Sequence, residues 1–178
     1  MSSFYDDGRL GQIGLTLFMG AGYSFYREET QLRADDQKVR TLVSELLAGA
    51  HKSIVAAEGR FRRERIPPPT RACPFPDPRI LTDARRLEAM GQTVAALEGQ
   101  VRHAPVPEND RMTQRYRDER ETLATLVEKD QLLVGRAETL RAMVAGQDAD
   151  ALLAMAAEID EGVAAIHDTL AARRILLT

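Results

Sequence analysis

The sequence has no Trp, and aromatic residues make up only 5% of its 178 positions. Ala and Leu must therefore fill most of any core, because few large aromatic anchors exist. A single cysteine, Cys73, excludes an internal disulfide framework and favours a reducing, cytoplasmic compartment. We expect no signal peptide, since the first residues are acidic and no small-residue cleavage site follows the apolar run.

The chain also has no large excess of charge of either sign: 24 basic residues nearly balance 27 acidic ones, for a formal net charge of −3. This excludes a global attraction to nucleic acid or anionic lipid, so we do not expect nucleic acid as a partner. Lysine is scarce, with three residues against 21 arginines. A hydrophobic content of 44% excludes wholesale disorder. One domain with a sizeable core, or an elongated helical assembly unit, fits this length.

Most of the chain shows apolar residues at alternating spacings of three and four, which is typical of helices with one buried face. We expect main helices over 28–65, 80–103, 107–145 and 149–177. Only the stretch AGQD, residues 145–148, separates the apolar series of the last two, so they should form an antiparallel hairpin, with Gly146 at the preceding C-cap. The predicted fold class is all-α, with four main helices, coiled-coil-like packing and an apolar N-terminal arm. The clearest stripe is Val39, Val43, Leu46, Ala50, Ile54, Ala57 and Phe61.

Two acidic residues, Glu119 and Asp130, occupy apolar heptad positions of the third helix. A metal site in a helical bundle would need further carboxylates and a Glu-x-x-His sequence, which does not occur here. The three histidines also lie on different predicted helices: His51, His103 and His167. We therefore expect no metal and no other cofactor, and we expect these carboxylates to set helix register or to meet an Arg from a neighbouring helix.

Six of the eight prolines fall between Pro67 and Pro78, which favours an extended connector over a helix. The predicted organisation is an arm at 1–27 and a helical bundle at 28–178, with this proline-rich connector at 66–79. The simpler interpretation is a stiff spacer, and the alternative is a docking strap for an acidic partner or for nucleic acid. Arginines surround it: Arg60, Arg62, Arg63, Arg65, Arg71, Arg79, Arg85 and Arg86.

Negative charge collects at the other end of the chain. Residues 148–168 contain six acidic side chains and neither Lys nor Arg. One interpretation is that these acidic residues pair with the arginines around the connector, within one molecule or between copies, where the attraction would steer assembly. The other is that they form a solvated helix face.

Residues 10–26 are uncharged, and six of the nine aromatics lie within the first 26 positions. As a strand, this segment places alternating apolar residues on one face, but no second strand is evident. As a helix it would rise about 25 Å, short of a hydrocarbon layer of about 30 Å. We hypothesise that the Ala and Leu helices of this chain cannot cover the segment, so a neighbour must shield it from water.

These patterns predict a non-enzymatic structural or adaptor subunit of a larger assembly. It would engage a protein partner or itself through the arm and the helical seams, with no catalytic residue and no small-molecule substrate. The alternative is a membrane-anchored coiled-coil protein with residues 10–26 in the bilayer. The candidate partner-binding residues are Leu15, Leu17, Phe18, Met19, Tyr23, Phe25, Tyr26, Arg62, Arg63 and Arg65.

Overall fold

The fold is seen in a computed structural model that describes residues 3–23, 32–71, 75–104 and 120–177. All regular secondary structure in these ranges is helical, so the predicted all-α class is confirmed. The described elements are η1 (Ser3–Tyr5), α1 (Asp7–Ala21), α2 (Leu32–Arg65), α3 (Pro78–Arg102), α5 (Arg120–Val144), α6 (Ala149–Ala154) and α7 (Ala156–Leu177). The predicted starts at 28 and 107 lie outside the described residues, as does Glu119.

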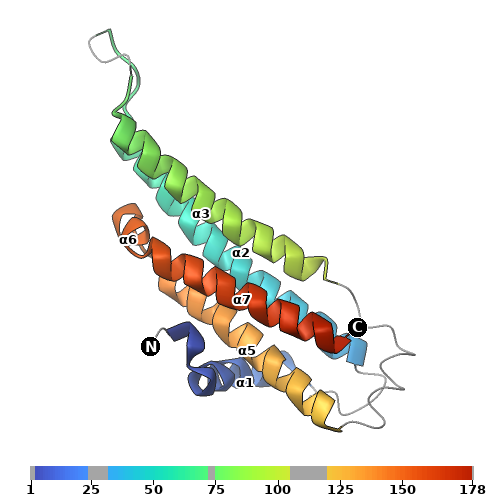
Figure 1. Ribbon diagram of the computed structural model, residues 1–178. Coiled ribbons are helices and arrows are strands. Elements are labelled where there is room, and N and C mark those ends of the chain that lie inside the picture. Colours follow the sequence, from blue (N-terminus) through green and yellow to red (C-terminus); the bar gives the residue numbers. More distant parts are fainter. Residues whose placement is uncertain (1–2, 24–31, 72–74, 105–119, 178) are drawn as a thin grey trace.

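The helices α2 and α3 form a long antiparallel hairpin (Figure 1). Every member of the predicted α2 stripe, from Val39 to Phe61, is buried. Leu87, Val94, Leu97 and Val101 of α3 are buried as well. Asp77 caps the start of α3 by accepting a hydrogen bond from the Arg79 amide at 2.8 Å, with Pro78 in the first turn. Apolar periodicity therefore identified the contact faces of both helices correctly.

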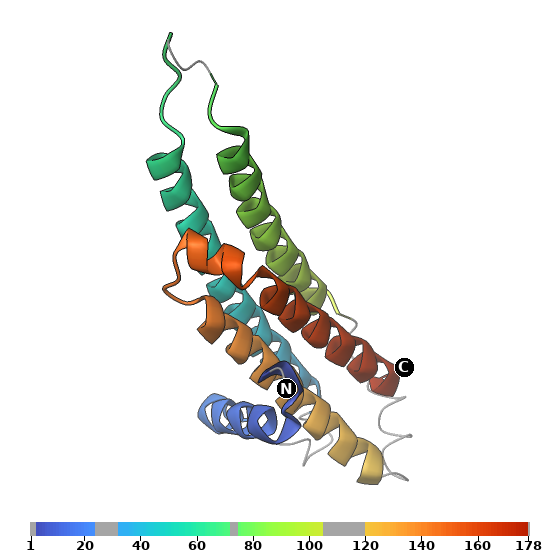
Figure 2. The same cartoon turned by 60° about the vertical axis from the view of Figure 1, so that its left-hand side comes forward.

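The chain then reverses between α5 and α7, which run side by side (Figures 1 and 2). Gly146 adopts a φ of 72° just beyond α5, which only glycine tolerates readily. Asp148 then accepts a hydrogen bond from the Ala151 amide at 2.8 Å and caps α6. The continuous helix predicted over 149–177 is instead interrupted at Met155, where α6 ends and α7 begins in a new direction.

The lower half of the α2–α3 hairpin packs against α5 and α7, whereas its upper half projects beyond them (Figure 1). Helix α1 lies against α5 (Figure 2). The strand interpretation of the N-terminal arm is therefore wrong, because Asp7–Ala21 is an α-helix. None of the described helices combines the length and apolar character that crossing a lipid bilayer requires.

Candidate interaction surfaces

Helix α1 buries Leu10, Gly14 and Phe18, which recur every four residues along one face. Its contact with α5 depends on two glycines. A Cβ atom on Gly14 would come within 2.2 Å of the Gln131 carbonyl oxygen, and one on Gly135 within 2.2 Å of the Leu10 carbonyl oxygen. The two backbones therefore cross at a distance that no other residue permits.

The hypothesis that this chain cannot cover its own N-terminal segment is wrong for that face of α1. Phe18 and Tyr23 are buried, and their rings stack with centroids 4.2 Å apart. Gly22 makes this possible, since its φ of 67° turns the chain back toward the helix. Neither ring is available to a partner. Of the other predicted binding residues on this segment, Leu15 and Leu17 are half-buried, Met19 is 74% exposed, and Phe25 and Tyr26 lie outside the described residues.

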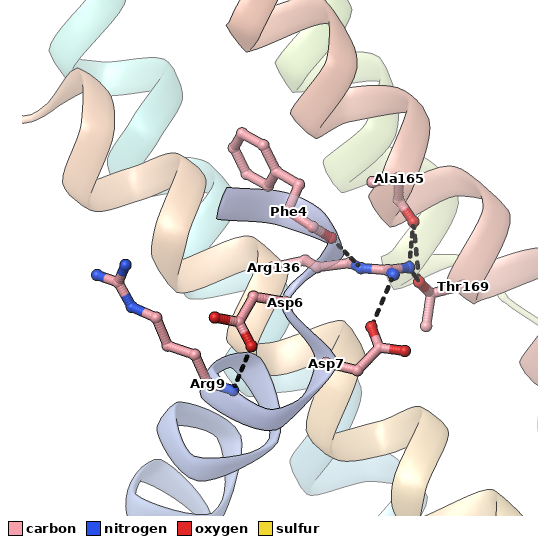
Figure 3. A network of polar contacts seen from close by, with 7 residues as sticks. All are labelled: Phe4, Asp6, Asp7, Arg9, Arg136, Ala165 and Thr169. Atoms are coloured by element: carbon pink, nitrogen blue, oxygen red, sulfur yellow. Dashed lines mark hydrogen bonds and ion pairs between the residues drawn. The ribbon is translucent and has the colours of Figure 1, made fainter. Parts of the chain in front are cut away.

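Arg136 of α5 joins the first residues to α7 (Figure 3). Its Nε donates to the Phe4 carbonyl at 3.1 Å, and its Nη1 donates to the Ala165 carbonyl at 3.0 Å and to the Thr169 hydroxyl. Its Nη2 lies 3.5 Å from an Asp7 carboxylate oxygen. One guanidinium therefore holds η1, α1 and α7 together, a use that matches its planar set of donors.

A second polar network is buried between α2, α5 and α7. Tyr23, two residues beyond the end of α1, also belongs to it. Arg173 Nε donates to Asp130 Oδ1 at 2.5 Å, and Arg173 Nη2 lies 2.8 Å from Asp36 Oδ1. The Tyr23 hydroxyl donates to Asp130 Oδ2 at 2.7 Å. The expectation that Asp130 meets an Arg from a neighbouring helix is confirmed. These charges are internal to the fold and offer nothing to a ligand.

The projecting end of the α2–α3 hairpin carries the basic surface. Residues 60–86 have a net charge of +5. Part of that charge is neutralised by ion pairs within the molecule. Arg62 Nη2 lies 2.9 Å from Glu88 Oε2, and Arg65 Nη2 lies 3.2 Å from Asp150 Oδ2. A hydrogen bond to Glu58 also raises the pKa of Arg62 above its ordinary value. Two of the three arginines predicted to bind a partner are therefore already paired.

Other arginines at this end are exposed and have no ion pair with any described carboxylate. One of them is Arg60, which donates to the Gln147 carbonyl at 3.3 Å, and the other four are Arg63, Arg71, Arg79 and Arg85. The chain between the two helices, at 66–71 and 75–77, forms no helix, as its prolines predicted. Phe75 within it is 84% exposed. We call Phe75 and these four arginines the hairpin tip.

A groove lies between α3 and α7, near the end of the molecule opposite the hairpin tip. It consists of two cavities of about 440 and 430 Å³ that share Gln100 and His167. The first also has His103 and Arg174 in its wall, and the second has Asp160 and Asp168. The groove is therefore basic toward the ends of α3 and α7 and acidic in its second cavity, with Gln100 and His167 between the two.

Sequence reasoning missed Arg136, Arg173 and Phe75. Nothing in their local pattern separates these arginines from solvated ones, and the exposure of Phe75 depends on how far the hairpin extends. Within the described ranges, no three side chains of the metal-ligating types come together. Comparison of the chain with protein-family models, curated proteins and solved structures finds no match.

Proposed function

We propose that this protein is a non-enzymatic adaptor that binds an acidic segment of a partner protein through the hairpin tip. The observation that carries the proposal is that the hairpin tip combines four exposed arginines, none paired with a described carboxylate, with the exposed Phe75. Arg and aromatic residues are the types most enriched among residues that dominate binding energy. The connector between α2 and α3, which carries Arg71 and Phe75, extends beyond the helices and is open to a large partner (Figure 1).

The role assigned to the N-terminal segment changes accordingly. Because Leu10, Gly14 and Phe18 are buried against α5, the segment completes the fold instead of carrying the main contact with a partner. The coarser part of the original expectation, an adaptor without catalysis, is retained. The proposed binding surface is the hairpin tip and no longer α1. Of the three arginines predicted to bind a partner, Arg63 is the one that has no described carboxylate partner.

Fluorescence anisotropy of a labelled polyglutamate peptide tests the proposal at low salt. The Arg63→Glu/Arg71→Glu double variant should bind it at least about tenfold more weakly than the native protein, because like charges repel across the contact. Phe75→Ser should also weaken binding. The matched control is Arg9→Glu/Lys52→Glu, which changes the net charge equally at exposed positions outside the tip.

Equal losses in the tip variant and the control would contradict the proposal, because binding would then follow net charge alone. Binding of labelled single-stranded DNA with no binding of the peptide would also contradict it, and would instead identify the tip as a nucleic-acid surface.

A further inference from the structure

We infer that Asp150 of α6 regulates binding at the hairpin tip by occupying Arg65, so that an acidic partner has to displace Asp150 to reach that arginine. This inference rests on the proposed function, because it concerns the same acidic partner at the same end of the molecule. Arg65 is the last residue of α2 and directly precedes the connector, which includes Arg71. It is therefore a further binding residue beside the tip, already paired with an internal carboxylate.

The Arg65 guanidinium makes two contacts that fix its position. Its Nη2 atom donates a hydrogen bond to Asp150 Oδ2 at 3.2 Å, across 85 positions of the chain. Its Cζ atom also lies 5.9 Å from the centre of the ring of Phe61, which is buried. A cation at this distance over an aromatic face is attracted to the ring. Arg65 is therefore held between a ring of its own helix and a carboxylate of another helix.

Asp150 is kept beside the arm by the anchoring of α6. Its neighbours Ala149 and Leu152 are buried, and α6 contacts both α2 and α3 (Figure 2). The turn before α6 is tied to the same arm, because Arg60 Nη2 donates to the Gln147 carbonyl at 3.3 Å. A carboxylate on an anchored helix meets its arginine without the loss of freedom that a flexible segment undergoes on binding. This internal contact therefore competes effectively with a partner.

Other carboxylates at this end have different contacts. Glu58 and Glu88 pair with Arg62, and all three residues belong to the α2–α3 hairpin. Asp148, two residues before Asp150, accepts a hydrogen bond from a backbone amide and caps α6. Asp150 thus brings to the arm a carboxylate from outside the hairpin.

The pair is exposed enough to exchange partners. The side chains of Arg65 and Asp150 are 54% and 70% exposed. An ion pair with this exposure contributes little to stability, because water screens it. A carboxylate of the partner can therefore replace Asp150 with little loss of stability, and until then Asp150 lowers the affinity of the tip.

Anisotropy of the labelled polyglutamate peptide at low salt tests the competition. Asp150→Asn should strengthen binding about threefold, because the peptide then no longer competes with Asp150 for Arg65. In an Arg65→Gln background the same substitution should change the affinity by less than about 1.5-fold. Glu64→Gln, which removes an exposed charge from α2, is the matched control, since its effect should be equal in both backgrounds.

NMR of the Asp150 carboxyl carbon, with labelled protein and unlabelled peptide, gives a readout that does not depend on small changes in affinity. Saturating peptide should move this resonance to its position in the Arg65→Gln variant, because both remove the same contact. An unmoved resonance, or an equal gain from Asp150→Asn in both backgrounds, would overturn the inference.

The two proposals fail in different ways. Peptide binding that the Arg63→Glu/Arg71→Glu variant loses, but that Asp150→Asn leaves unchanged, would overturn this inference and support the proposed function. No peptide binding by the native protein or by Asp150→Asn would overturn both.

Discussion

Ser44 and Glu98 show how a single hydroxyl sets the ionisation of a carboxyl at the α2–α3 contact. The Ser44 hydroxyl donates to Glu98 Oε1, and Arg102 Nη2 lies 2.5 Å from the same oxygen. Together, with the hydroxyl contributing most, they lower the pKa of Glu98 below its ordinary value of 4.5. A carboxyl whose pKa is lowered by folding stabilises the protein above its unfolded pKa, and that stability is lost as pH falls through the folded pKa.

Ser44→Ala should therefore raise the pKa of Glu98 toward 4.5 and reduce the loss of stability on acidification below that value. Titration of the Glu98 side-chain carbonyl carbon by NMR measures the shift. Ser53→Ala is the matched control, because the Ser53 hydroxyl donates to the Gly49 carbonyl and to no carboxylate. An unchanged Glu98 titration in Ser44→Ala would contradict the assignment.

Arg173 is a buried cation that connects α7 to α2 and α5. It is 2% exposed and contacts the carboxylates of Asp36 and Asp130, both 0% exposed. Arg173→Met would remove the guanidinium that contacts both buried carboxylates and leave Asp36 only Arg40, on its other oxygen, so we expect a loss of about 3–5 kcal/mol in the free energy of unfolding. Arg85→Met, at an exposed site on α3, should change it by less than about 0.5 kcal/mol. Chemical denaturation measures both, and similar values for the two variants would refute the account.

For single residues, the sequence showed which position was unusual but not which residue it contacts. A charged residue at a heptad core position, Asp130, was visible as a break in an apolar series, and its pairing with an arginine was predicted correctly. The identity of the partner was not visible, because Arg173 lies 43 residues further along and among several other arginines. Burial of a charge depends on which helices meet, and that is a property of the assembled fold.

Among the elements, α1 is the one that sequence reasoning placed wrongly. Phe18 lies between Leu17 and Met19 and so does not fit the alternation of a strand, but it belongs to the helical series of Leu10 and Gly14 that the structure buries. The signal for a helix was weak because glycine disfavours helix formation by about 1 kcal/mol per residue. The compensating contact is Gly135, which lies far along the chain and has no local signature. Long, strongly periodic helices such as α2 and α3 could be predicted from the pattern of their own residues, without knowledge of a distant contact.

The close crossing of α1 and α5 gives a matched pair of glycine substitutions. Gly14→Ala should destabilise the protein by about 1–3 kcal/mol, because the added Cβ would overlap the backbone of Gln131. Gly20→Ala, in the same helix, places its Cβ where no atom lies within 4 Å and should stabilise the helix by about 0.5–1 kcal/mol. Thermal unfolding by circular dichroism measures both. Effects of the same sign would show that α1 does not cross α5 in this way.

For the whole molecule, the two candidate surfaces lie at opposite ends of the α2–α3 hairpin. The tip is at the projecting end, and the α3–α7 groove is near the ends of α3 and α7 (Figure 1). Sequence reasoning found the two charged segments, residues 60–86 and 148–168, but left open whether they meet within one molecule. Arg65 and Asp150 show that they do, with Arg65 Nη2 3.2 Å from Asp150 Oδ2.

Several contacts of η1 and the end of α1 have partners that are made more than a hundred residues later. The Arg136 bond to Phe4 spans 132 positions of the chain, and the Tyr23 bond to Asp130 spans 107. At a synthesis rate of about 5–20 residues per second, α1 is made roughly ten seconds before the α5 surface that covers it. During translation, the apolar face of α1 has to remain exposed or be held by another molecule, so this helix reaches its native position well after its own residues have been joined.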